Sequence, residues 1–201
     1  MRILTSSLRL AAAVVVCACS GPQIPDAAAG TSLITSPNAA APFTVSSATF
    51  KNNQFVPATM VYDHKGSGCS GGNQSPQLSW SGVPKGTKSF AVLTLDTTAI
   101  FWHWGMYNIS PTLTSLPENA GTAKSKYGTE VLNDWAIYYG TANRGYDGPC
   151  PPPDGPHHYV FTVYALNARL KLSRSAYVED LDLAIRGHIL GAASVTGLYK
   201  T

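Results

Sequence analysis

Charge is the scarcest property of this sequence, since only 12% of its 201 residues are Asp, Glu, Lys or Arg. The 14 basic and 11 acidic residues are spread along the chain, so the formal charge of +3 reflects no basic cluster. This excludes a nucleic-acid-binding protein, which needs a concentrated basic surface. Few Glu and Lys beside 18 Gly and 14 Pro also exclude long surface helices, and with them helical bundles and coiled coils.

Apolar and aromatic residues are plentiful by contrast. They make up 44% and 10% of the chain, which is enough for a packed core and excludes disorder of the whole chain. The length suits one domain with an extension. The composition therefore predicts a β-rich globular domain with much loop.

Long hydrophobic runs are nearly absent, and the one at residues 8–18 is too short to span a bilayer as a helix. Arg2 and Arg9 precede or open it, as in a secretory signal. The run ends in Val16-Cys17-Ala18-Cys19-Ser20, which resembles the bacterial lipobox, with Cys19 as the cysteine that is acylated. We expect residues 1–18 to be a lipoprotein signal peptide; the alternative is an ordinary signal peptide cut after residues 27–29.

Residues 19–43 are expected to form the acylated cysteine and a flexible tether, because Pro, Ala, Ser and Gly dominate and Asp26 is the only charge. Acylation by more than one chain gives stable anchoring. The expected location is therefore the extracytoplasmic face of a bacterial membrane, with a folded domain over residues 44–201.

Short apolar segments bounded by Gly, Pro, Asn and Asp predict strands in that domain. The candidates are residues 89–96, 103–109, 135–139, 157–166 and 194–199. Together with little helix, they predict a mostly-β domain, with α+β as the neighbouring class.

One segment has helical periodicity. Tyr177, Leu181, Ile185 and His188 recur at intervals of three and four residues, and Ser175 is placed to cap the start. We expect one or two peripheral helices, this one among them.

Several polar residues interrupt the aromatic strands and suggest a binding pocket. His103 lies in an aromatic run, Asp96 ends a strand, and His157 and Tyr159 share one strand face, with His158 on the other. Imidazole N–H groups and a phenol would donate to a small oxyanion such as phosphate, while Asp96 fixes a tautomer or accepts from the ligand. The alternative for each histidine is a hydrogen-bonded core residue.

Ordered motifs from about residue 44 to the C-terminus resemble the phosphatidylethanolamine-binding protein family, in its bacterial, Raf-kinase-inhibitor-like branch. The motifs include Ser75-Pro76-Gln77-Leu78-Ser79-Trp80, Trp102-His103-Trp104, Gly148-Pro149-Cys150-Pro151-Pro152 and Gly155-Pro156-His157-His158-Tyr159. The resemblance implies an antiparallel β-sandwich with a small pocket for phosphate-like and other anions. By position it implies Asp96, His103, Pro151, His157 and Tyr159 as the ligand-binding residues, without a cofactor.

The sequence departs from the family pattern in three places. Thr97, Thr98 and Ile100 replace a second acid and two prolines of the loop after Asp96, His158 replaces an arginine, and Ser70 stands in the Cys-Asp-Gly motif. These changes leave the preferred ligand open.

The cysteines support export. If Cys17 is removed with the signal and Cys19 is acylated, Cys69 and Cys150 remain, and an even pair in an exported domain predicts a disulfide. The alternative is two buried free thiols.

Other function classes are less well supported. Residues 68–72 resemble the nucleophile motif of trypsin-like proteases, but the only His before it is His64, beside Asp63 and too close for a first barrel. A metal site of Asp96, His103 and His157 lacks any known local spacing. We therefore expect no catalytic residues and no metal.

The expected function is a membrane-anchored, non-enzymatic binding protein whose partner is a small anion or a phospholipid head group. The alternative is a regulatory protein-interaction module with a vestigial pocket. Oligomeric state and any protein partner stay open.

Overall fold

The computed structural model describes residues 41–63, 68–140 and 144–201. The predicted signal peptide, the acylation site Cys19, the tether up to residue 40 and His64 therefore lie outside the described residues. Within the described part, no helix is long and apolar enough to cross a membrane.

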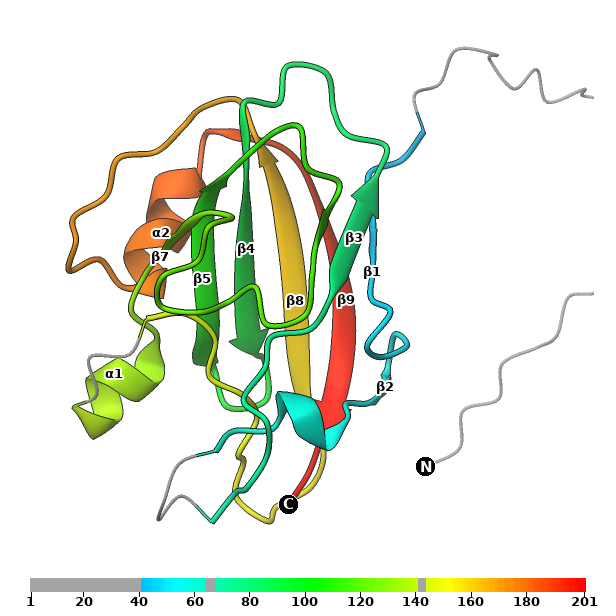
Figure 1. The fold of residues 1–201 in the computed structure, drawn as a ribbon, viewed down its shortest axis with the longest axis vertical. Coiled ribbons are helices and arrows are strands. Elements are labelled where there is room, and N and C mark those ends of the chain that lie inside the picture. The colour runs from blue at the N-terminus through cyan, green and yellow to red at the C-terminus, as the bar shows by residue number, and fades with distance from the viewer. Residues whose placement is uncertain (1–40, 64–67, 141–143) are drawn as a thin grey trace, which may run out of the picture. The chain divides into compact units, whose positions relative to one another are not determined.

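Two sheets form the fold (Figure 1). The larger has the strand order β2-β9-β8-β4-β5-β7 and the smaller β1-β3-β6. Neighbouring strands are antiparallel except β2 and β9. The larger sheet comprises β2 (Gln54–Phe55), β4 (Ser89–Asp96), β5 (Phe101–Ile109), β7 (Thr129–Glu130), β8 (His157–Leu166) and β9 (Ile189–Tyr199); the smaller comprises β1 (Thr44–Ser46), β3 (Leu78–Ser81) and β6 (Ser115–Leu116).

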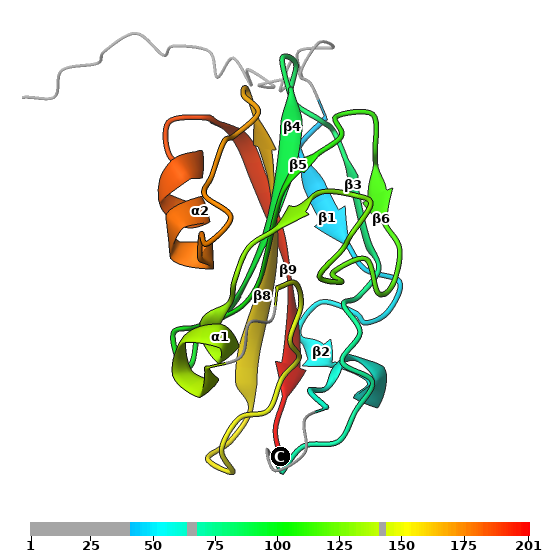
Figure 2. The ribbon, with the colours of Figure 1, turned by 60° about the vertical axis from the view of Figure 1, so that its left-hand side comes forward.

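The molecule has three layers, which Figure 2 shows edge-on: the helices α1 (Asp134–Tyr139) and α2 (Val178–Ile185), the larger sheet, and the smaller sheet. A 3-10 helix, Ala58–Met60, lies on the side of the smaller sheet. This arrangement confirms the predicted mostly-β sandwich with peripheral helices.

The central strand β4 separates two hydrophobic cores. Phe90 and Val92 pack into the core between the sheets, whereas Ala91 and Leu93 face the core under α2. Because side chains alternate along a strand, a strand covered on both faces is a continuous apolar run. This explains why residues 89–96 could be identified as a strand with the correct bounds.

The prediction of a strand over residues 135–139 is wrong, since these residues belong to helix α1. Asn133 has extended backbone at the N-cap position, Asp134 follows in the first turn, and Gly140 ends the helix at φ 64°. A glycine in this left-handed region is a common helix stop, and an acid in the first turn suits the helix dipole. One turn and a half is too short to show a helical period.

The predicted C-terminal helix is present as α2, but it starts later than expected. Ser175 is not its cap: its hydroxyl instead contacts the Ser173 hydroxyl at 2.8 Å. The carboxylate of Asp180 accepts the backbone N–H of Tyr177 at the helix start, at 2.9 Å. The helix ends at Ile185, so His188 lies beyond it and contacts Asn167.

Candidate functional site

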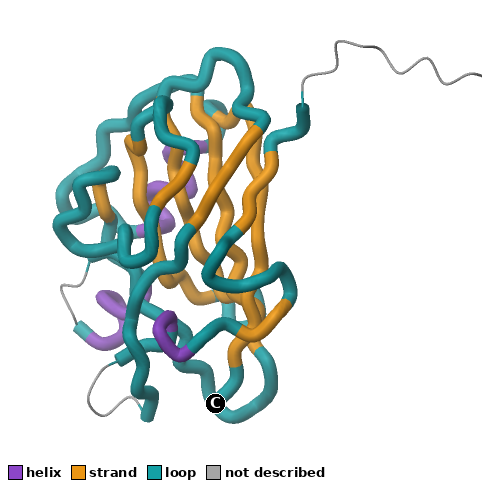
Figure 3. Tube along the Cα trace, turned by 45° about the vertical axis from the view of Figure 1, so that its right-hand side comes forward, coloured by secondary structure: helices purple, strands orange, loops and turns teal. Residues whose placement is uncertain are grey.

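A cavity of about 140 Å³ opens at the end of the large sheet where β4 ends and β5 and β8 begin. Loops and short helices gather at this end, at the bottom of Figure 3. All five residues that the sequence selected line the cavity: Asp96, His103, Pro151, His157 and Tyr159. Its other lining residues are Ala99, Phe101, Trp135, Tyr139, Cys150 and Pro152. We call it the head-group pocket, after the ligand class that the sequence predicts for these residues.

His157 lies between two carboxylates. Its Nδ1 is 2.6 Å from Asp96 Oδ2, and its Nε2 is 3.0 Å from Asp154 Oδ1. Desolvation lowers the pKa of His157, but the hydrogen bonds to Asp96 and Asp154 outweigh it, and the net shift is upward. Since carboxylates only accept, both ring nitrogens are best satisfied when the imidazolium donates from each.

The second oxygen of Asp96 organises the turn between β4 and β5. Oδ1 accepts the backbone N–H groups of Thr98 at 2.8 Å and Ala99 at 3.2 Å. Ile100 completes the turn at φ 54°, with its side chain exposed. The Asp96 carboxylate therefore holds this turn, in which Thr97, Thr98 and Ile100 stand, through two backbone hydrogen bonds.

His103 is buried and takes the opposite protonation state. Its Nδ1 is 2.7 Å from the backbone carbonyl oxygen of Asp147, so Nδ1 carries the proton. Burial lowers the pKa of His103, and this effect is larger than the upward effect of the hydrogen bond to the Asp147 carbonyl. The neutral ring keeps a lone pair on Nε2, and it can donate to an anion from Nε2 only after taking up a proton.

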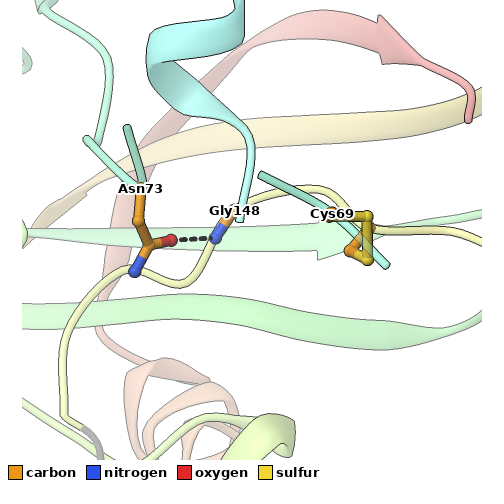
Figure 4. The surroundings of a disulfide bond; sticks show 4 residues. Cys69, Asn73 and Gly148 are labelled. Carbon is orange, nitrogen blue, oxygen red and sulfur yellow. Dashed lines mark hydrogen bonds between the residues drawn. A yellow bond between two sulfur atoms is a disulfide. The ribbon is translucent and has the colours of Figure 1, made fainter. Parts of the chain in front are cut away.

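The Asp147 side chain anchors the loop behind His103. Its two oxygens accept from Asn73 Nδ2 at 3.0 Å and Asn133 Nδ2 at 2.8 Å. Asn73 also accepts the backbone N–H of Gly148 at 2.7 Å, as Figure 4 shows beside the disulfide. A Cβ at Gly148 would overlap the carbonyl oxygen of Met60, so only glycine lets the loop approach this closely.

Cys69 and Cys150 form a disulfide with their Cα atoms 5.8 Å apart. The bridge ties the Gly/Ser-rich segment around Cys69 to the proline-rich loop that lines the pocket (Figure 4). The predicted cysteine pairing therefore agrees with the structure.

Aromatic rings form the remaining wall, and sequence reasoning did not select them. Trp135 contacts Tyr139 with ring centroids 4.7 Å apart, and Phe101 meets Trp135 edge-on at 5.5 Å. Trp135 was missed because its segment was interpreted as a strand.

Tyr159 completes the polar part of the wall. Burial raises the pKa of Tyr159 far above its ordinary value, and the nearby Asp96 charge raises it further. Its hydroxyl therefore stays protonated and has one hydrogen bond to donate, either to Asp96 or to a ligand.

Within residues 41–63, 68–140 and 144–201, no group of three or more His, Cys, Asp or Glu is arranged to hold a metal ion. Asp96, His157 and Asp154 are instead joined through the ring nitrogens that a metal would need.

Comparisons with known proteins identify the family of this chain. The family model described as phosphatidylethanolamine-binding protein matches residues 46–200. UPF0098 protein YbcL of Escherichia coli K12 is 38% identical over 175 residues, covering 80% of this chain and 89% of YbcL. A UPF0098 protein of Methanothermobacter thermautotrophicus is 42% identical over 137 residues, or 66% of this chain and 86% of that protein.

Solved structures show the same fold. The crystal structure of E. coli YbcL, described as a new member of the mammalian PEBP family, has a TM-score of 0.71 at 34% identity and covers 80% of this chain and 99% of that one. The Chlamydia trachomatis protein CT736, described as a putative PEBP homolog, has a TM-score of 0.64 at 29% identity and covers 80% and 98%. The chain belongs to the phosphatidylethanolamine-binding protein family.

Proposed function

We propose that this protein is a membrane-anchored, extracytoplasmic binding protein whose head-group pocket takes the phosphate-type head group of a lipid. The observation that carries the proposal is the burial of Asp96, His103, His157 and Tyr159 around one small cavity. Ionisable groups are costly to bury without a partner, so such a cluster in a cavity is a marker of a binding site.

The pocket suits a phosphate group bound by proton donors. Tyr159 offers its hydroxyl, and protonated His103 would offer Nε2–H. A hydrogen bond to a charged group is worth about 1.5–3 kcal/mol. The anion thus stabilises the protonated form of a histidine that burial alone keeps neutral.

The charge of the pocket favours a zwitterion over a simple anion. With His157 protonated, the Asp96–His157–Asp154 group carries a net negative charge, because two carboxylates flank one cation. An ammonium group is attracted by carboxylates and by the faces of aromatic rings, which Phe101, Trp135 and Tyr139 supply. Phosphoethanolamine combines both requirements.

The rim of the pocket suits a ligand that stays attached to a lipid. Ile100 is 71% exposed beside the lining residue Phe101, and Tyr138 is 70% exposed and stacks on that ring at 5.7 Å. Exposed apolar and aromatic side chains around a polar cavity are typical of lipid and membrane interaction sites.

The disulfide supports an extracytoplasmic location, because the Cys69–Cys150 bond persists in oxidising compartments and is rare in the cytosol. Substituting Cys19→Ala should abolish N-terminal acylation and release the protein from the membrane fraction, whereas Cys17→Ala should not. Mass spectrometry of the mature N-terminus measures acylation in both variants, and membrane fractionation measures release. An unacylated N-terminus in the unsubstituted protein would contradict the proposed lipid anchor and would leave the pocket proposal unaffected.

The pocket is tested by calorimetry with glycerophosphoethanolamine, a soluble head group. His103→Ala should weaken binding about tenfold or more, and His157→Gln should also weaken it while keeping a donor for Asp96. His188→Ala, far from the pocket in sequence and bonded to Asn167, is the matched control. Unchanged binding in both pocket variants, or equal loss in the control, would contradict the proposal.

A further inference from the structure

A second cavity, of about 330 Å³, lies beside β7, at the edge of the large sheet opposite β2. It is lined by Lys124, Arg144 and Arg174 together with the hydroxyl-bearing residues Ser125, Thr129 and Ser173. None of these lines the head-group pocket. We call it the basic cavity.

Backbone pairing places the segments of the two arginines on either side of Leu132. Leu132 forms an antiparallel bridge with Arg144 and a parallel bridge with Tyr177. The Leu132 N–H donates to Ala176 at 3.0 Å, and its carbonyl oxygen accepts from Val178 at 2.9 Å. The segment after β7 thus has Arg144 on one side and the segment that leads into α2 on the other.

The cations of this cavity have no acidic partner. Among residues 41–63, 68–140 and 144–201, the ion pairs involve only His157 and Arg186 as cations. The Arg144 guanidinium donates only to a neutral group, the backbone carbonyl of Glu130, at 3.4 Å. Asp180, in a neighbouring hollow, is engaged by the backbone N–H of Tyr177.

Of the acids in the described part of the chain, only Glu130 lines the basic cavity, and it forms no ion pair with the cations there. Burial, partly offset by the hydrogen bond from Trp104, raises its pKa well above the ordinary value. Oε2 accepts from Trp104 Nε1 at 3.0 Å, while Oε1 is buried without a partner. The Glu130 carboxyl group therefore lies inside the protein, away from an anion in the cavity.

The two arginines also line an adjacent cavity of about 550 Å³, which contains Ser175 and Tyr177. Guanidinium groups match the oxygens of phosphate with pairs of parallel hydrogen bonds. We propose that the basic cavity is a second anion-binding site, separate from the head-group pocket, that takes a phosphate monoester or diphosphate group through Arg144, Arg174 and Lys124.

The test is calorimetry with inorganic pyrophosphate on the purified protein. Arg144→Gln with Arg174→Gln should weaken binding about tenfold or more, since each removes a charged hydrogen bond. Lys85→Gln with Lys88→Gln removes the same charge from the exposed turn before β4 and should leave the affinity unchanged. Arg174→Gln alone should weaken binding by a smaller factor. Because Arg174 is exposed, this variant still tests the site if the Arg144 substitution prevents folding.

His103→Ala separates this proposal from the head-group pocket, because it should leave pyrophosphate binding unchanged. The proposal is overturned if pyrophosphate does not bind, if His103→Ala abolishes binding, or if the Lys85/Lys88 variant loses as much as the arginine variant. Flotation with vesicles containing phosphatidic acid identifies the source of the phosphate. Binding that the arginine variant loses indicates a lipid phosphate, whereas binding of pyrophosphate alone indicates a soluble ligand.

Discussion

The head-group pocket and the basic cavity both present groups that can bind phosphate, but they compensate charge in opposite ways. In the pocket, the His157 cation is matched by Asp96 and Asp154, and His103 is kept neutral by burial. In the basic cavity, Lys124, Arg144 and Arg174 are left without acidic partners among the described residues. On the two proposals above, the pocket binds a zwitterion and takes up a proton at His103, whereas the basic cavity binds an anion through uncompensated positive charge.

The two regions also depend on different parts of the fold. The pocket wall is built from loops held by the Cys69–Cys150 bridge and by the amides around Asp147. The basic cavity rests on backbone bridges at Leu132. Perturbing the loops should therefore damage the pocket first.

The largest effect is expected from Cys69→Ser with Cys150→Ser. The bridge closes a loop with a sequence separation of 81, and its loss should cost about 2–5 kcal/mol in the free energy of unfolding. Because Cys150 lines the pocket, glycerophosphoethanolamine binding should also fall. Chemical denaturation and calorimetry measure the two effects.

The basic cavity provides the control for this experiment. Pyrophosphate binding should persist in the cysteine variant under conditions where it is folded. If both ligands are lost in parallel while the protein remains folded, the two regions are not independent.

Head-group binding should strengthen as pH falls, because the phosphate binds the protonated form of His103. Burial lowers the pKa of free His103, so affinity should rise on lowering pH from 8, by at most about tenfold per pH unit, and level off below that pKa. His157 stays protonated to higher pH, since its pKa is raised.

Glycerophosphoethanolamine suits this measurement because its phosphodiester does not titrate in the range. His103→Gln should abolish the slope measured by calorimetry. A slope that survives in that variant would assign the proton to another group.

Asp154→Asn should increase the affinity of the pocket for glycerol 3-phosphate, a head group without the ammonium that Asp154 would attract, by a smaller factor, about threefold to tenfold. The Asp154 side chain is 61% exposed, yet it accepts from His157 Nε2 and adds a negative charge beside the pocket. The substitution removes that charge and weakens the competing hydrogen bond. Titrating the variant and the unsubstituted protein in parallel measures the ratio; weaker binding in the variant would show that Asp154 orients His157 for the ligand.

The sequence predicted the pocket better than the basic cavity for a physical reason. Alternation along a strand places His157 and Tyr159 on one face, and β8 has the predicted bounds. Arg144 and Arg174 come together through isolated bridges between irregular segments, which have no periodicity to read. The same limit hid Trp135, whose short helix is defined by Asn133 and Gly140 at its ends.

Short strands were also missed for this reason. β2, β6 and β7 have two residues each, so they show no alternation. They exist because the longer strands beside them supply hydrogen-bonding partners, as Met106 does for Glu130. Pairing at long range, rather than local propensity, decides these elements.

The smallest effect is expected at α1, the element that both regions share. Trp135 and Tyr139 line the head-group pocket, whereas Ala136 and Gly140 line the hollow next to the basic cavity. Asp134 holds the start of this helix by accepting the backbone N–H of Trp102 at 2.7 Å. Burial, with Glu179 nearby, raises its pKa to about 7 despite that bond.

The folded protein therefore binds one proton more than the unfolded chain between the ordinary aspartate pKa and about 7, and its stability falls as pH rises through this window. Asp134→Asn keeps an acceptor for Trp102 and removes the charge. It should stabilise the protein by about 0.5–1 kcal/mol at pH 8, or a few degrees in Tm, and leave it unchanged at pH 4. Glu118→Gln, at an exposed acid, should show no such pH-dependent difference in thermal melts. A loss of stability at pH 8 in Asp134→Asn would mean that the charge anchors α1, and both cavities would then depend on it.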